Sequence, residues 1–259
     1  MALTAKHLFS DSMLKLLNPE QGMYTINHIF EPEYHQDIYV KACDDTKNAT
    51  GSFQVGDIQY LVRPINRGTQ PSYADDENDH ETLRYEGMIS CDGTRLIDEN
   101  QTLNVCALKS NCIRNGYIDT SLARSVGRTF YKKVESRAAV QKNDILINST
   151  GDGTIGRVAV YNYDFPAVVD GHITIVRYKN PKLAWYVAAF LMTETGQNQI
   201  YRYINGSSGQ VEIYPQDIAR IWVKPASSEV IEEVYKNYKN ACDKHDEFYR
   251  DLTAALHKI

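Results

Sequence analysis

Several features that would assign this 259-residue sequence to a common class of protein are missing. It has no apolar run long enough to cross a bilayer, so no membrane association is expected. Its five cysteines form no C-x-x-C pair, which favours free thiols in a reducing compartment. Lys6, Asp11 and Lys15 stand where a secretory signal would be apolar. We therefore expect a soluble, cytoplasmic protein.

An overall basic charge is also missing, because the formal net charge is −5. The charge is unevenly distributed, however. Residues 1–109 hold 9 basic and 17 acidic side chains, residues 110–226 hold 14 and 9, and residues 227–259 hold 5 and 7. The middle of the chain is thus locally basic, as contact with phosphate requires. Ordinary surface lysines and arginines would give the same balance.

The pattern of β-branched residues and turn residues predicts a β-rich α/β domain. Strands are predicted at 144–149, 156–163, 172–178, 209–214 and 219–225. Asn180 and Pro181 predict the start of a helix that continues to residue 204. We place this domain at 56–226. An N-terminal extension at 1–55, expected to pack on the main domain, precedes it, and a long helix at 227–259 follows it.

The last helix has an apolar seam with alternating spacings of three and four residues. The seam consists of Ile231, Val234, Tyr238, Ala241, His245, Phe248, Leu252, Ala255 and Ile259. This a/d heptad pattern is typical of a helix that pairs with another helix in a coiled coil. Two interpretations stay open: an arm that pairs with another chain, and a terminal helix that lies on its own domain.

A glycine-rich segment suggests nucleotide binding at first sight. Gly151, Gly153 and Gly156 form a literal G-x-G-x-x-G. The dinucleotide fingerprint needs a helix after its third glycine, but the alternating "RVAVYNYDFP" predicts a strand here. Arg157 and Val158 replace the lysine and hydroxyl of a P-loop, and the kinase lysine and H-R-D motif are missing. The segment is therefore predicted to be a turn between two strands.

The side chains of this turn suit contact with a DNA backbone. Amides, hydroxyls and an arginine are the groups that meet phosphates, and the turn offers Asn148, Ser149, Thr150, Thr154 and Arg157. A purely structural hairpin turn is the alternative.

Evidence for catalysis is weak. The candidate groups are Asp144, Asp152, Asp170 and His172, and no metal-ligand spacing or nucleophile motif connects them. The adenine methyltransferase signature N-P-P-[FY] is also missing. We expect no catalytic residue, no metal and no cofactor.

Three segments in this order resemble one known family. They are "INRGTQPSYADD" (65–76), "VQKNDILINSTGDGTIGRVAVY" (140–161) and "INGSSGQVEIYPQDIARIWVKPAS" (204–227). Together they are similar to the target recognition domain of type I restriction–modification specificity subunits. The resemblance covers roughly residues 56–259.

The resemblance implies a non-catalytic subunit that reads one half of a split double-stranded DNA target. It also implies an adenine methyltransferase subunit as partner and, in complexes that cut DNA, a restriction and translocation subunit. Three loops would face DNA. Their residues are Arg67, Gly68, Thr69, Gln70 and Pro71 in the first; Asn148, Ser149, Thr150, Gly151, Gly153, Thr154, Gly156 and Arg157 in the second; and Gly206, Ser207, Ser208, Gly209 and Gln210 in the third. Arg67, Gln70, Arg157 and Gln210 are the candidate base readers.

The sequence departs from the family pattern in two ways. Most members carry two recognition domains and two helices, whereas this chain has one of each. Its seam then needs a helix from a second copy or from another specificity chain. The family's domain also begins close to its "GDI" segment, whereas here that segment starts at Gly56 after the extension. A protein-interaction module and a stand-alone DNA-binding domain of another anti-phage system are the alternatives; a nucleotide-dependent enzyme is disfavoured.

Overall fold

The computed structural model describes residues 32–71, 105–206, 211–256 and 258–259, in which two four-stranded sheets carry most of the core. The first sheet has the order β2-β9-β6-β7 and is antiparallel throughout. Its strands are β2 (Asn66–Arg67), β6 (Ile145–Asn148), β7 (Val158–Val160) and β9 (Ile173–Val176). The second has the order β4-β3-β8-β5, with β3 and β8 parallel. Its strands are β3 (Val105–Leu108), β4 (Arg124–Val126), β5 (Ala139–Val140) and β8 (Ala167–Val169).

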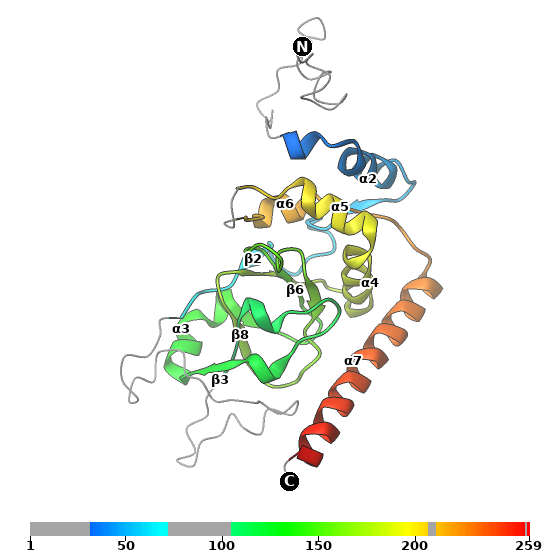
Figure 1. Ribbon diagram of the computed structural model, residues 1–259. Coiled ribbons are helices and arrows are strands. Elements are labelled where there is room, and N and C mark those ends of the chain that lie inside the picture. Colours follow the sequence, from blue (N-terminus) through cyan, green and yellow to red (C-terminus); the bar gives the residue numbers. More distant parts are fainter. Residues whose placement is uncertain (1–31, 72–104, 207–210, 257) are drawn as a thin grey trace, which may run out of the picture.

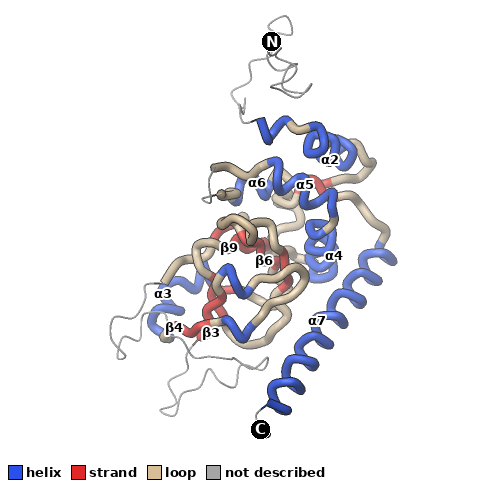
Figure 2. The backbone as a smooth tube through the Cα atoms, in the orientation of Figure 1, coloured by secondary structure: helices blue, strands red, loops and turns tan. Residues whose placement is uncertain are grey.

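The helices lie on the outer sides of these sheets (Figure 1). They are α2 (Asp37–Lys47), α3 (Arg128–Ala138), α4 (Pro181–Met192), α5 (Glu194–Arg202), α6 (Pro215–Ala219) and α7 (Ser228–Leu256). Short 3₁₀ turns occur at Pro32–His35, Ser110–Cys112 and Thr120–Leu122. Figure 2 shows α3 on one side of the strands and α4 with α7 on the other. The expected mixed α/β domain with a long C-terminal helix is confirmed.

Both faces of each sheet are buried, which explains the continuous apolar runs. In β6, Ile145 and Ile147 point into a core shared with α4 and α7, while Leu146 points into the core between the sheets. In β3, Cys106 and Leu108 face that same inter-sheet core, and the alternate residues face α3. Successive side chains of a strand point to opposite faces, so each strand contributes to two cores.

The predicted helix from residue 181 to 204 is in fact two helices. Asn180 caps α4 as expected, because its side-chain oxygen accepts from the backbone N–H of Lys182 and Leu183. The chain then leaves helical geometry at Thr193, which ends α4 and caps α5 by accepting from the N–H of Gly196. A threonine hydroxyl can accept a hydrogen bond from a backbone N–H in place of a helix carbonyl, so a separate helix begins after Thr193.

Four of the five predicted strand regions hold strands: β6, β7, β9 and β10 (Trp222–Val223). The prediction at 209–214 is wrong for its described part. There Glu212 forms only isolated bridges, to Thr150 and to Asn205. The backbone groups of residues 211–213 form hydrogen bonds with two different neighbouring segments, so these residues do not pair as a strand along the length of either one.

The described part of the N-terminal extension contacts the main domain. Strand β1 (Phe53–Gln54) pairs with β10, and α2 packs against α5. The Arg202 guanidinium lies 4.4 Å from the centroid of the Tyr34 ring. Residues 1–31 lie outside the described residues.

Candidate nucleic-acid interface

The three segments that carry the sequence resemblance meet at one end of the strands of the first sheet, where β2 and β6 end and β9 begins. Strand β2 pairs with β9, which places Arg67 opposite Thr174. The N–H of Gly151 donates to the carbonyl of Val211 at 3.1 Å, and the N–H of Ile213 donates to the carbonyl of Ser149 at 2.9 Å. Segments about 80 and 60 residues apart in sequence therefore form one surface.

The glycine-rich turn is a connection between antiparallel strands β6 and β7. Its ends are closed by the N–H of Asn148 donating to the carbonyl of Arg157 and by the N–H of Gly156 donating back to Asn148, each at 2.9 Å. Gly151 and Gly156 have φ of 91° and 82°, a region where side chains are strained. A strand follows the glycines, so there is no helix N-terminus for a pyrophosphate. The nucleotide interpretations stay excluded.

Five predicted DNA contacts are buried, and their predicted role must be corrected. Asn148 and Ser149 have no exposed surface. The Asn148 amide donates to the carbonyl of Ser110 at 2.8 Å, and the Ser149 hydroxyl shares a 2.5 Å hydrogen bond with Thr174. Gly68, Pro71 and Gly156 are also buried. These residues hold the loops in place and cannot reach DNA in this conformation.

The remaining described members of the predicted set are at least partly exposed: Arg67, Thr69, Gln70, Thr150, Gly151, Gly153, Thr154, Arg157 and Gly206. Of these, Gln70, Gly153 and Gly206 are the most exposed. Arg157 folds back on its own turn, where its Nη2 donates to the carbonyl of Gly153 at 3.1 Å. Ser207, Ser208, Gly209 and Gln210 lie outside the described residues.

Arg67 connects the first and third segments. Its guanidinium forms an ion pair with Glu212, donates to the carbonyl of Ile213 at 2.6 Å, and lies 5.3 Å from the centre of the Tyr214 ring. The hydrogen bond from Arg67 holds the pKa of Glu212 below its usual range. In this structure the Arg67 guanidinium therefore holds the third segment in place. To form hydrogen bonds with a base, it would have to break its ion pair with Glu212.

The turn between β8 and β9 adds two side chains, Asp170 and His172, which the sequence analysis considered only as candidate catalytic groups. His172 is exposed, and its Nδ1 shares a 2.7 Å hydrogen bond with the hydroxyl of Thr150. Asp170 is buried; burial raises the pKa of its carboxyl, opposed by the His172 N–H that donates to it at 2.8 Å. His172 thus belongs to the edge of the candidate interface. A single histidine in a turn gives no sequence signal for this, because only the pairing of β6 with β9 brings it to Thr150.

The acidic groups considered for catalysis do not form a common site. Asp144 is 1% exposed and accepts two hydrogen bonds from the Arg177 guanidinium, at 2.7 and 2.6 Å. It lies at the start of β6, whereas Asp152 is exposed on the turn at the other end. Within the described ranges, no group of three or more His, Cys, Asp or Glu side chains could hold a metal ion. No described helix is both long enough and apolar enough to span a membrane.

The first half of α7 packs on its own domain. The Tyr238 ring lies edge-on to Trp185 with ring centroids 4.8 Å apart, and Ile231 and Tyr235 pack against the same core. Further along α7, the centroids of the His245 and Tyr117 rings lie 4.1 Å apart. Ile231, Tyr238 and His245 were expected in a partner-facing seam, but they contact this domain because α4 and the 115–118 turn lie beneath them.

The rest of the seam faces outward. Phe248 is 63% exposed and Leu252 is 44% exposed. Ala241, Ala255 and Ile259 are also exposed, and Val234 is partly exposed. We refer to Ala241, Phe248, Leu252, Ala255 and Ile259 as the outer stripe of α7. It is the part of the predicted seam that stays available to another helix.

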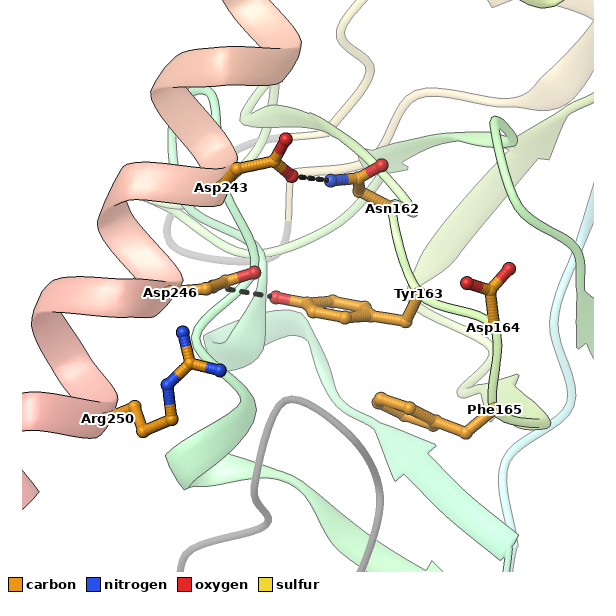
Figure 3. A pocket seen from close by; sticks show the side chains of 7 residues that line it. All are labelled: Asn162, Tyr163, Asp164, Phe165, Asp243, Asp246 and Arg250. Atoms are coloured by element: carbon orange, nitrogen blue, oxygen red, sulfur yellow. Dashed lines mark hydrogen bonds between the residues drawn. The ribbon is translucent and has the colours of Figure 1, made fainter. Parts of the chain in front are cut away.

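Polar contacts fix the second half of α7 around a cavity of about 450 Å³ (Figure 3). The Asn162 amide donates to Asp243 at 2.8 Å, and the Tyr163 hydroxyl donates to Asp246 at 3.2 Å. Phe165 stacks on Tyr163 with ring centroids 5.1 Å apart, and Arg250 lies at the edge of the cavity. These contacts set the direction of the helix relative to the sheets.

Comparisons with known proteins were made by sequence and by structure. No protein-family model matches the chain, and no curated sequence matches it. Among solved structures, the type IIG restriction endonuclease BpuSI is similar, with a TM-score of 0.53 and 9% identity over 79% of this chain and 28% of that chain. This likeness establishes the fold alone.

Two further structures come from type I restriction–modification systems. One describes complex assembly of such a system, with a TM-score of 0.44 and 9% identity over 85% of this chain and 46% of that chain. The other is the S subunit from M. genitalium, with a TM-score of 0.42 and 10% identity over 85% of this chain and 49% of that chain. The chain spans at most about half the length of these structures.

Proposed function

We propose that this chain is the sequence-specific double-stranded DNA recognition subunit of a type I restriction–modification complex. The observation that carries the proposal is the convergence of the three motif segments at one end of the strands of the first sheet. Exposed loops held by a buried scaffold suit recognition, because the scaffold positions groups that remain free to contact a ligand. Gln70, Thr150, Thr154, Arg157 and His172 are the described side chains offered to DNA.

The chemistry of modification is assigned to a partner. Within the described residues no group of three or more His, Cys, Asp or Glu side chains could hold a metal ion, and the sequence lacks the adenine methyltransferase signature N-P-P-[FY]. In the proposed complex, an adenine methyltransferase subunit modifies the DNA that this chain selects, and a restriction subunit can join. The DNA-facing loops and α7 lie on different sides of the sheets, so both could be engaged at once (Figure 1).

The outer stripe of α7 is proposed to pair with the same stripe of a second copy. A two-fold pair would bring two recognition domains onto one DNA, and each would read one half of a split target. From Phe248 onward the stripe positions are spaced by four, three and four residues, and Ala241 lies one heptad before Phe248, as helix pairing requires.

Selection from a random pool of double-stranded DNA tests the recognition role. We expect the purified protein to enrich one sequence in two inverted half-sites with a fixed spacing. Enrichment of a single half-site would support DNA recognition but would refute the two-fold pair. If the protein enriches no sequence, with or without a methyltransferase partner, the proposed function is wrong.

Sedimentation equilibrium of Phe248→Glu/Leu252→Glu tests the pairing of α7. Deleting the helix would expose the buried Trp185, so substitutions on the outer stripe are the sharper perturbation. We expect a dimer for the natural chain and a monomer for the variant. The matched control is Asn240→Glu/Ala254→Glu, which adds the same charge at exposed positions away from the stripe. A natural chain that is monomeric at every concentration would exclude self-pairing.

A further inference from the structure

Helix α3 has an unusually basic outer face. Its exposed basic residues are Arg128, Lys132, Lys133 and Arg137. Val134 and Ala138 bury the opposite face of the helix against β3 and β8. The only acidic residue of the helix is Glu135, which accepts a hydrogen bond from Tyr131 at 3.3 Å. Within the described parts of the chain, none of these four basic side chains takes part in an ion pair.

Two hydrogen bonds join the end of α3 to the chain at the start of the first motif segment. The Arg63 guanidinium donates to the carbonyl of Ser136 at 2.6 Å, and the Asn66 amide donates to the carbonyl of Arg137 at 2.7 Å. Asn66 is in β2, directly before Arg67. The basic helix therefore flanks the first loop, on the side of the sheets away from α7 (Figure 1).

The described residues of the three loops carry little free positive charge. Arg67 is neutralised by Glu212, and Arg157 is bonded to its own turn next to the exposed Asp152. Most of the affinity of proteins for DNA comes from neutralising phosphates with lysine and arginine. A DNA-binding surface built on these loops thus needs a source of positive charge beside them.

We infer that the basic face of α3 binds the phosphate backbone of DNA that flanks the bases read by the loops. This inference rests on the proposed function, because it assumes that the loops lie on DNA. The contacts position the protein on the duplex and carry no sequence information. Lysine and arginine side chains four residues apart on a helix can follow a phosphate strand, since they share one face.

The test compares two triple variants of the full chain in DNA-binding titrations at several salt concentrations. The first is Arg128→Gln/Lys132→Gln/Lys133→Gln on α3. The control is Lys236→Gln/Lys244→Gln/Lys258→Gln, which removes the same charge from exposed positions on or just after α7. Each lost phosphate contact lowers the slope of log affinity against log salt by about 0.9. We expect the α3 variant to lose roughly 2–3 from this slope, again at about 0.9 per contact, with an unchanged sequence preference. The control should keep a nearly natural slope.

Three results would overturn the inference while leaving DNA recognition intact. They are an α3 variant with the slope of the control, an α3 variant that loses its sequence preference, and an α3 variant that binds DNA more tightly. If the natural chain binds no DNA at all, the proposed function fails and this inference fails with it. Thermal melts of both variants verify folding, since the changed side chains are exposed.

Discussion

The substitution Tyr238→Ala tests whether α7 is an integral part of the domain. Tyr238 is partly buried, it packs edge-on against the fully buried Trp185, and burial raises the pKa of its hydroxyl. Burying an aromatic side chain removes about 150–250 Å² from water. At about 25 cal/mol per Å² this corresponds to roughly 4–6 kcal/mol as an upper bound.

The expected loss of stability is smaller than this bound, because Tyr238 keeps some exposure. Truncations of well-packed aromatic residues cost about 3–5 kcal/mol, so we expect roughly 3 kcal/mol here. For a chain of this size, 1 kcal/mol corresponds to about 2–4 °C in Tm, so the melting temperature should fall by roughly 6–12 °C. The emission of Trp185 should also shift toward that of a solvated indole.

The matched control is Phe248→Ala on the same helix. Its ring is 63% exposed, and substitutions of exposed side chains usually change stability by no more than about 0.5 kcal/mol. Both variants are melted at a protein concentration where the chain is monomeric. A Tyr238→Ala protein that melts within 1 °C of the control would refute the reasoning, since it would mean that α7 contributes nothing to the core beneath it.

Three further predictions concern the loops and the sheet beneath them. Gly68→Ala should destabilise the chain by about 1–3 kcal/mol and weaken DNA binding, because its Cβ would stand 2.1 Å from a carbonyl oxygen of β8; unfolding by urea and a binding titration measure both. Asp144→Asn should cost roughly 3–5 kcal/mol by leaving Arg177 unpaired in the interior, with sequence preference unchanged in the stable fraction; an unaltered urea midpoint would contradict this. Glu212→Gln should destabilise the chain at neutral pH. Because the pKa of Glu212 is lowered by Arg67 when folded, the natural chain loses this advantage as pH falls through that pKa, and the two melting curves should converge in acid.

Much of the fold was predictable from local pattern. Strands β6, β7 and β9 occur where β-branched runs were bounded by turn residues, and Asn180 with Pro181 correctly predicted the start of α4. These signals are local: a cap bonds to N–H groups two and three residues ahead, and a strand shows its character in its own side chains. The exclusion of a dinucleotide-binding site was equally local, because it needed only the strand that follows Gly156.

The candidate site was predicted less completely. The three segments were found, but the sequence could not separate the buried Asn148 and Ser149 from the exposed residues of the same turn. Their burial depends on Ser110 and Thr174, which other strands bring to them. His172 was missed for the same reason.

The sequence by itself determined the elements of this protein: the strand runs, the turn that Gly151 and Gly156 permit, and a long helix with a heptad seam. Only the tertiary structure decided which half of that seam is used internally, because α4 presents Trp185 to Tyr238 and leaves Phe248 and Leu252 uncovered. It also decided that Arg67 holds Glu212. The sequence pattern shows which side chains are apolar or charged. The residue that each of them contacts comes from a segment far away in the sequence, and only tertiary packing brings the two together.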